Sequence, residues 1–367
     1  MRTRAVNAER LIAASRRLGD AVVDPTLWPQ IMDEICAAAG ATGAALLQTD
    51  IRTPDIPRTA SVDHCFRHYF AMGWQTRDTR AERSVPLLMR GLPVVTDQDI
   101  VTPEEMRRLD FYNECALPFG LPWFAGIGLR AGPALWAMVI QRTWRQGPFE
   151  PHEARILALL APRLTEAATL ARAVGHAALS AMTNALQMLE QPALALDRLG
   201  FVLEANAAAQ EIFDDEFLVR DRHLTVRDKQ ASQALEALAD RLRTTSDAAP
   251  LPAPPIVVHR AAKRPLVIRI MPVAGPARTP FLGARALLVI SDLHNRPQPQ
   301  PSVLAKTFGL TPAETRVASI MADGISIERA ADRLGLSRAT VRNELKAIFA
   351  KTATHRQGEL VALLSRL

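Results

Sequence analysis

The chain has 367 residues, 48% of them hydrophobic, and a net charge of +6 from 44 Lys and Arg against 38 Asp and Glu. This length favours two to three domains. The three widely spaced cysteines argue against a disulfide scaffold and a cysteine-rich zinc site, and the lack of any run of about twenty apolar residues argues against a membrane span. The basic N-terminus has no apolar run of the signal-peptide type, so we expect a cytoplasmic protein.

The first 175 residues alternate helical and strand patterns. Helices are predicted over 8–18 and 28–39, a strand over 44–48, and a hairpin from 125–130 and 134–141 around 131–133. This order resembles the α/β sensor domains of the GAF type or of autoinducer-binding proteins, and we assign residues 1–176 to such a domain.

Aromatic residues gather in this first domain, and all five tryptophans precede residue 150. They could line an apolar ligand pocket in which Asp78, with Arg77 beside it, orients a polar group; the predicted lining is Trp74, Asp78, Tyr112, Trp123 and Trp136. Packing of the same rings in an ordinary core is the alternative. His64 and His68 stand four residues apart, a spacing that can bind metal, but no second ligand pair accompanies them and we expect no metal.

Residues 151–189 have helical propensity, interrupted by Pro162 and Gly175. Apolar residues recur every three or four positions, at Leu157, Leu160, Leu164, Ala168 and Ala171. This pattern fits a connecting helix that pairs with its mate in a dimer or a helix buried within its own domain, and both interpretations stay open.

Two strands, helices and three further strands are predicted between residues 185 and 295. The strands are expected over 193–197, 201–205, 256–260, 266–272 and 286–292, with Asn206 capping the helix after the second strand. The order resembles a PAS domain, which we assign to residues 177–295. That resemblance implies a small-molecule sensor or a dimerisation unit and names no ligand.

Motifs for common catalytic chemistry are missing from the sequence. No GxxxxGK[ST] phosphate loop and no GxSxG serine elbow occurs. We therefore expect a protein that is not an enzyme and that holds no cofactor.

A proline-rich linker, 296–301, precedes a helical segment, 302–367, that carries +4 of the net charge. Thr311, Pro312 and Glu314 form a capping-box start for one helix, and Ser326 caps a second. Gly335 allows a tight turn before Ser337, the expected cap of a third helix.

The third helix separates apolar from polar residues. Val341, Leu345 and Ile348 share one stripe, and Asn343 and Lys346 lie roughly opposite. Asn pairs with adenine, and Arg or Lys with guanine, on base edges of the DNA major groove. A basic solvated face on an ordinary three-helix domain is the alternative.

The segment from Leu310 to Val361 resembles the helix-turn-helix of LuxR/NarL-type regulators, through LTPAE, ADGIS, ADRLGLS, TVRN, IFAK and RQGELV. The resemblance implies a four-helix domain with the third helix in the major groove. The DNA-contacting residues carried over or expected beside them are Arg338, Thr340, Arg342, Asn343, Lys346 and Lys351. The chain departs from the family pattern at Arg329, Ala330 and Ala353, and the last residue suggests a different end to the third helix.

The sequence thus predicts a multidomain α+β protein: two α/β sensor-type domains, then an all-α four-helix helix-turn-helix domain. We expect a cytoplasmic, ligand-responsive transcription regulator that binds operator DNA as a homodimer. The helix 151–189 and the last helix, with Leu360, Val361, Leu363 and Leu364, are the expected seams. The alternative is an interaction protein whose sensor domains bind another regulator, with DNA binding secondary.

Overall fold

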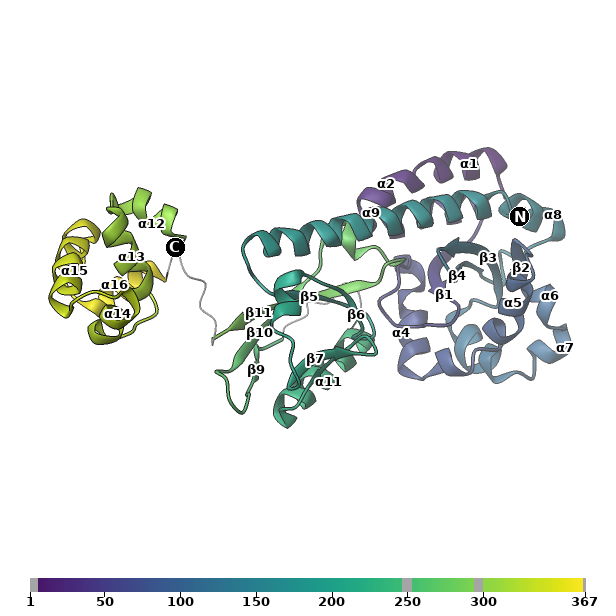
Figure 1. The fold of residues 1–367 in the computed structure, drawn as a ribbon. Coiled ribbons are helices and arrows are strands. Elements are labelled where there is room, and N and C mark those ends of the chain that lie inside the picture. The colour runs from purple at the N-terminus through teal and green to yellow at the C-terminus, as the bar shows by residue number, and fades with distance from the viewer. Residues whose placement is uncertain (1–5, 246–252, 294–299, 366–367) are drawn as a thin grey trace. The chain divides into compact units, whose positions relative to one another are not determined.

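The computed structural model describes residues 6–245, 253–293 and 300–365, which divide into two compact units (Figure 1). The larger unit holds Met1–Arg260 and Val267–Ser291, and the smaller holds Ala261–Leu266 and Asp292–Leu367. The larger unit mixes helices and sheets, in agreement with the predicted α+β class. Within the described residues, no helix is both long enough and apolar enough to cross a bilayer.

The first part of the larger unit is built on a four-stranded antiparallel sheet with the strand order β1-β4-β3-β2. Its elements are α1 (Ala8–Arg16), α2 (Leu18–Val23), α3 (Trp28–Ala39), β1 (Gly43–Gln48), α4 (Asp63–Ala71), α5 (Thr79–Met89), β2 (Val94–Thr96), α6 (Asp97–Ile100), α7 (Pro103–Met106), a π-helical turn (Phe111–Ala116), β3 (Trp123–Ala131), β4 (Ala134–Arg142), α8 (Pro151–Leu157) and α9 (Leu160–Met188). Short 3₁₀ turns lie at Pro25–Leu27, Ala60–Val62, Trp74–Thr76 and Leu117–Phe119.

The predicted hairpin is confirmed as β3 and β4, paired from Trp123 and Arg142 to Ala131 and Ala134. Gly132 occupies its turn with φ +61°, a conformation that suits glycine. Side chains alternate along each strand. Trp136, Met138 and Ile140 therefore join the core on one face of the sheet, whereas Ala137 and Val139 face the other.

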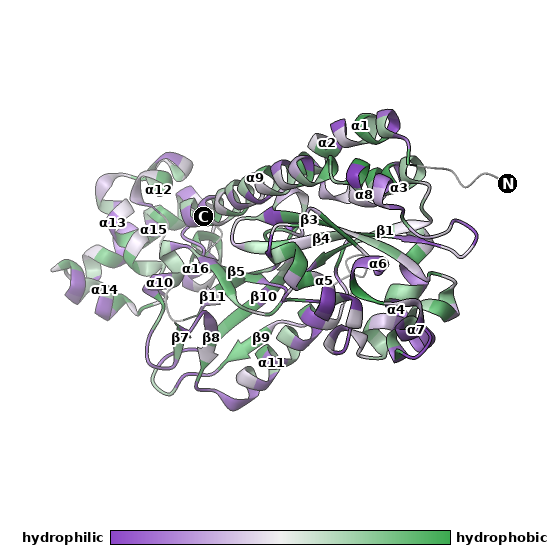
Figure 2. Ribbon diagram, turned by 90° about the vertical axis from the view of Figure 1, so that its right-hand side faces the viewer, coloured by the Kyte–Doolittle hydropathy of each residue, from purple (hydrophilic) through white to green (hydrophobic). Residues whose placement is uncertain are grey.

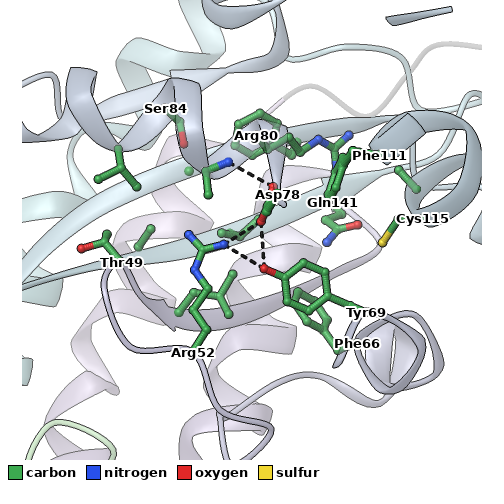
Figure 3. A pocket seen from close by; sticks show the side chains of 18 of the residues that line it. Thr49, Arg52, Phe66, Tyr69, Asp78, Arg80, Ser84, Phe111, Cys115 and Gln141 are labelled. Atoms are coloured by element: carbon green, nitrogen blue, oxygen red, sulfur yellow. Dashed lines mark hydrogen bonds and ion pairs between the residues drawn. The ribbon is translucent and has the colours of Figure 1, made fainter. Parts of the chain in front are cut away.

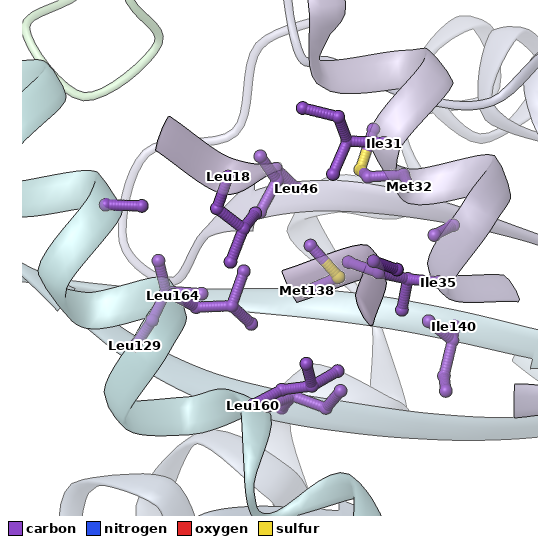
Figure 4. Packing of buried hydrophobic residues seen from close by; sticks show 14 of the residues in the cluster. Leu18, Ile31, Met32, Ile35, Leu46, Leu129, Met138, Ile140, Leu160 and Leu164 are labelled. Atoms are coloured by element: carbon purple, nitrogen blue, oxygen red, sulfur yellow. The ribbon is translucent and has the colours of Figure 1, made fainter. Parts of the chain in front are cut away.

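Helices α1, α2, α3 and the first half of α9 cover the first of these faces (Figure 4). Met138 and Ile140 of β4 pack there with Ile35 of α3 and Leu160 and Leu164 of α9. All five side chains are buried. The second face is covered by α4, α5 and the π-helical turn.

Helix α9 runs without a break through Pro162 and Gly175, so the predicted interruptions are wrong. Pro162 lies in the first turn, where its missing N–H leaves no gap in the helix hydrogen bonding. Gly175 is required by packing: a Cβ there would lie 2.7 Å from Thr279 Cγ2 and 2.9 Å from the Pro276 carbonyl oxygen.

The apolar stripe predicted for residues 151–189 is buried within its own unit and spans two helices, since α8 ends at Leu157 and α9 begins at Leu160. Its members, Leu157, Leu160, Leu164, Ala168 and Ala171, all belong to the core of the first part. The structure therefore favours the buried-helix alternative for these residues. The domain boundary expected after residue 176 falls inside α9.

The second part of the larger unit holds a five-stranded sheet with the order β6-β5-β11-β10-β9. Its elements are β5 (Ala193–Asp197), β6 (Val202–Ala205), α10 (Ala207–Glu211), β7 (Phe217–Arg220), β8 (His223–Val226), α11 (Lys229–Thr244), β9 (Ile256–Val258), β10 (Leu266–Pro272), a 3₁₀ turn (Gly275–Arg278) and β11 (Ala284–Asp292). Strands β5, β9, β10 and β11 are largely hydrophobic (Figure 2). The five strands predicted from the sequence are all present, and Asn206 caps α10 by accepting from the Ala209 amide at 2.9 Å.

The smaller unit contains five helices among the residues described after Gln300. They are α12 (Pro301–Phe308), α13 (Pro312–Met321), α14 (Ile327–Leu334), α15 (Arg338–Thr352) and α16 (Gln357–Leu364). The Thr311–Glu314 capping box and the Ser326 and Ser337 caps are confirmed. Most of the expected linker, from 296 to 299, lies outside the described residues.

Candidate functional site

The apolar core of the smaller unit fixes the orientation of α15. Val341, Leu345 and Ile348 are buried against α13, α14 and α16. Gly335, at φ +66°, ends α14 and turns the chain into α15, and Ser337 caps α15 by accepting from the Thr340 amide at 3.0 Å. The opposite face of α15 is therefore held outward by packing and by its cap.

All six predicted DNA-contacting residues lie exposed on α15, and five of them, Arg338, Thr340, Arg342, Asn343 and Lys346, lie in its first nine residues. This face offers guanidinium, amide and ammonium donors within three turns of helix. Phosphates and base edges of DNA are the ligands that such a set matches.

Lys351, the sixth, is used within the unit. Its Nζ lies 2.6 Å from Glu314 Oε2 and donates to the Gly309 carbonyl at 3.1 Å. Glu314 is the capping-box residue of α13. Lys351 therefore ties the end of α15 to the start of α13, an ion pair that the sequence spacing of 37 residues did not suggest.

A second candidate site is a cavity on the sheet face that α4 and α5 cover (Figure 3). It has a volume of about 50 Å³. Its lining is mostly apolar and comes from six elements; it includes Leu47, Phe66, Ser84, Leu88, Phe111, Phe124, Ala137 and Val139. A space of this size holds a few water molecules. A drug-sized ligand needs several hundred Å³, so its entry requires side chains to move.

The polar end of the cavity is an ion pair with a shared hydroxyl. Arg52 Nη1 lies 2.7 Å from Asp78 Oδ2 and 2.8 Å from the Tyr69 hydroxyl, which itself donates to Asp78 Oδ2 at 3.0 Å. The other Asp78 oxygen caps α5 by accepting from the Ala81 amide. The cap fixes the carboxylate, and the carboxylate positions Arg52.

Burial and charge act together on these groups. Burial and the neighbouring Asp78 carboxylate raise the pKa of Tyr69, so its hydroxyl keeps its proton. Burial alone would lower the pKa of Arg52, but Asp78 and Tyr69 more than offset this, and the net pKa is raised. Arg52 is therefore charged throughout the physiological pH range.

Arg52 and Asp78 also line an outer hollow of about 490 Å³, together with Thr49, Ala81 and Val85. The same five residues line the inner cavity. The ion pair thus stands at the boundary between an apolar interior and a polar mouth.

Gln141 of β4 brings an amide into the cavity lining (Figure 3). Gln141 is 5% exposed, and its buried Oε1 has no hydrogen-bond partner among the residues that the structure describes. An unpaired buried acceptor costs about 1–3 kcal/mol. A bound molecule that donates an N–H or O–H here would remove that cost.

Comparison with known proteins gives no family assignment: no family model and no curated protein matches the chain. Similar solved structures include the ligand-binding domain of VqsR from Pseudomonas aeruginosa, at 15% identity over 43% of this chain and 94% of that one, with a TM-score of 0.34. The phage VqmA–DPO complex aligns at 16% identity over 51% of this chain and 88% of that one, with a TM-score of 0.22. The DhaR(N)–DhaL complex of E. coli aligns at 12% identity over 77% of this chain and 87% of that one, with a TM-score of 0.23. All three TM-scores are too low to establish a shared fold.

Of the five residues predicted to line a ligand pocket, Asp78 alone lies on the cavity. Trp74 packs edge-on against Phe111, and Arg77 lies over its ring at 3.9 Å. Tyr112 donates to Asp97 Oδ1 at 2.6 Å, in a buried cluster that also holds Arg80.

The remaining two tryptophans lie away from the cavity. Trp123 packs edge-on against Trp144, and Trp136 points to the α9 face of the sheet, where it meets Phe281 at 5.1 Å. The prediction of a single tryptophan-lined pocket is corrected on this point, because strand alternation puts Trp136 and Ala137 on opposite faces. Sequence reasoning missed Arg52 and Gln141; a glutamine within an otherwise apolar strand was the available signal.

His64 and His68 do share a face of α4, as their spacing predicted. Both rings pack on Phe119, with ring centroids 5.2 Å apart in each case. Phe119 thus occupies the side of the helix on which the two imidazoles meet.

Proposed function

We propose that this chain is a sequence-specific DNA-binding transcription regulator, and that its larger unit senses the signal that controls it. The observation that carries the proposal is the outward face of α15, where Arg342, Asn343 and Lys346 are exposed opposite a buried apolar stripe. The LuxR/NarL-type motifs of residues 310–361 support it. No catalytic step is part of the proposal, and the cytoplasm is its expected location.

The roles of the α15 side chains follow from their chemistry. Asn343, Arg342 and Lys346 are the candidates for base edges in the major groove. Arg338 and Thr340, in the first turn, are the candidates for phosphates, because a helix N-terminus also offers free amides and a positive dipole end. Lys351 is left out of this set because Glu314 already pairs with it.

The test begins with selection of DNA from a random duplex library by the full chain. An enriched sequence is expected, and Arg342→Ala and Lys346→Ala should each weaken its binding by about 1–3 kcal/mol. Lys306→Ala, which removes an exposed charge from α12, is the matched control and should change affinity little. If no sequence is enriched, or if the double variant binds as well as the unaltered chain, the interaction-protein alternative takes its place.

The cavity of the first part is the proposed effector site. Its apolar walls suit an amphipathic small molecule, with a donor group for Gln141 Oε1 and a polar or anionic head that reaches Arg52. A ligand regulates only if it binds two states of the protein with different affinity. A polar head group bound to Arg52 would replace the contact that Arg52 makes with Asp78 in this structure.

We also propose a homodimer, with α9 as its seam. Residues 173–189 contain no Asp, Glu, Lys or Arg. Exposed positions recur at alternating spacings of four and three: Leu170, Val174, Ala177, Ala181, Asn184 and Met188. This is the spacing with which one helix packs on another in a coiled coil. A second copy would also supply the second half-site reader that a short recognition helix needs.

A further inference from the structure

The loop 49–58, between β1 and α4, carries two ion pairs, at the two ends of the four-residue stretch 52–55. Arg52 points to the cavity, and Asp55 points to the second part of the larger unit. Both ends of the loop are fixed on the first sheet, since the Thr49 amide donates to the Leu135 carbonyl and the Leu46 amide to the Pro57 carbonyl, each at 3.0 Å.

Asp55 meets two arginines of the second sheet. Arg285 of β11 lies with Nη1 3.2 Å from Asp55 Oδ2, and Arg198, directly after β5, has Nη1 3.6 Å from Oδ1. All three side chains are almost fully buried, at 3–5% exposed. Arg198 also donates to the Pro280 carbonyl, and Arg285 to the Thr245 carbonyl at 3.3 Å.

Burial makes this contact sensitive to the position of Asp55. The Asp55 carboxylate pairs with two buried guanidinium groups, and removing one partner of a buried ion pair is strongly destabilising. The Asp55 carboxylate of the loop 49–58 thus holds the second sheet to the first part of the unit.

The stretch between the two ion pairs is stiff. It consists of Thr53 and Pro54; the proline ring fixes one backbone dihedral, and Arg58 Nη1 donates to the Pro54 carbonyl at 2.8 Å. The Thr53 hydroxyl donates to Asp55 Oδ1. Few free backbone dihedrals therefore lie between Arg52 and Asp55, and a displacement of Arg52 is passed on to Asp55.

We propose that the loop 49–58 couples the cavity to the second sheet: releasing Arg52 from Asp78 loosens the hold of Asp55 on Arg198 and Arg285. The inference rests on the proposed function only in taking the cavity as the effector site. A bound head group that takes over Arg52 would then change how the second part of the unit is held. Such coupling requires that the loop 49–58 have two arrangements, one favoured by the empty cavity and the other by the bound ligand.

Backbone amides on the second sheet report on this contact without any ligand. The Arg198 amide donates to the Gly283 carbonyl at 3.0 Å, and the Val273 amide to the Arg285 carbonyl at 3.1 Å. Hydrogen exchange of the full chain, measured on peptides covering 193–200 and 270–292, is the readout. In Arg52→Ala these peptides should exchange about threefold faster or more than in the unaltered chain.

A double variant separates coupling from general loosening. In the Asp55→Asn background the link is already cut, so adding Arg52→Ala should change exchange there by less than about 1.5-fold. Arg52→Lys, which keeps the charge, should restore much of the native protection. Arg67→Ala is the matched control, because Arg67 is an exposed arginine on α4 paired with Asp63.

Unchanged exchange at 193–200 and 270–292 in Arg52→Ala overturns the proposal, as does an equal effect with and without Asp55. If circular dichroism shows that Arg52→Ala has unfolded, Asp78→Asn, which removes the charge that holds Arg52 but can still cap α5, takes its place and should also speed exchange relative to Arg67→Ala. The same variants assayed on DNA distinguish the two proposals: coupling without any DNA binding would refute the regulator and leave the loop's role standing.

Discussion

Ala353 is a residue whose backbone conformation does not suit its side chain. It ends α15 with φ +54° and ψ +35°, the left-handed region in which glycine is favoured. The sequence suggested that α15 would end differently because a glycine was missing. The helix instead keeps the left-handed cap, and the alanine carries the strain.

Ala353→Gly should therefore stabilise the smaller unit by about 0.5–1 kcal/mol. This is the strain energy that is relieved, minus the entropy cost of ordering glycine, which is more flexible in the unfolded chain. Ala350→Gly, three residues earlier and inside α15, should destabilise it by about 1 kcal/mol. Denaturant unfolding of the full chain, followed through the smaller unit, measures both. Two changes of the same sign would contradict this account of the cap.

Glu314 gives a pH dependence at the same scale. The hydrogen bond from Lys351, with that from the Thr311 amide, holds the pKa of Glu314 below its ordinary 4.5. Because the folded pKa is the lower one, this stabilisation is fully present above about pH 4.5 and is lost as pH falls through the folded pKa.

The free energy of unfolding of the smaller unit should accordingly fall less steeply between about pH 5 and pH 3 in Glu314→Gln than in the unaltered chain. Lys351→Met, which removes the partner and keeps the carboxylate, should flatten the same profile. A Lys351→Met profile as steep as the native one would show that the ion pair contributes nothing to it.

At the scale of elements, local signals were read well from the sequence. Thr311, Ser337 and Asn206 cap the helices that they were expected to cap, because a cap depends on residues only three positions away. The hairpin of β7 and β8 was missed. Its turn, Asp221–Arg222, has φ of +49° and +64° without any glycine, so the usual sequence sign of such a turn is absent.

The candidate sites divide in the same way. The α15 face was predictable since its residues lie within one helix. The cavity was not, because Arg52, Tyr69, Asp78 and Gln141 come from four separate elements and meet only through packing. Aromatic composition pointed to tryptophans, which fill cores instead.

Gly175 offers a test of packing between elements. Gly175→Ala would place a methyl group 2.7 Å from Thr279 Cγ2, and we expect a loss of about 1–3 kcal/mol in the unfolding free energy of the larger unit. Gly19→Ala, in α2 with nothing within 4 Å, should be neutral or stabilising because alanine favours a helix. Thermal or denaturant unfolding gives both values, and a tolerated Gly175→Ala would refute the close approach.

At the scale of the whole molecule, the exposed face of α9 is the expected contact between the two copies of a homodimer. Val174→Glu with Ala181→Glu should convert a dimer into a monomer, because the two charges would face their copies across an apolar seam. Sedimentation equilibrium of the full chain measures this. Thr169→Glu, exposed on another side of the same helix, should leave the dimer intact. A native chain that sediments as a monomer at all concentrations would refute the seam.

Helix α9 serves two sheets at once: Leu164 and Ala168 are buried in the first core, and Leu179 is buried in the second. Since each residue turns a helix by about 100°, the two ends of α9 are locked in phase. One residue inserted between positions 168 and 179 would rotate the buried face of one end of α9 by about 100° away from its sheet. Seven inserted residues, close to two full turns, would nearly restore the original orientation. Insertions along α9 are therefore expected to be tolerated only in steps of whole helical repeats.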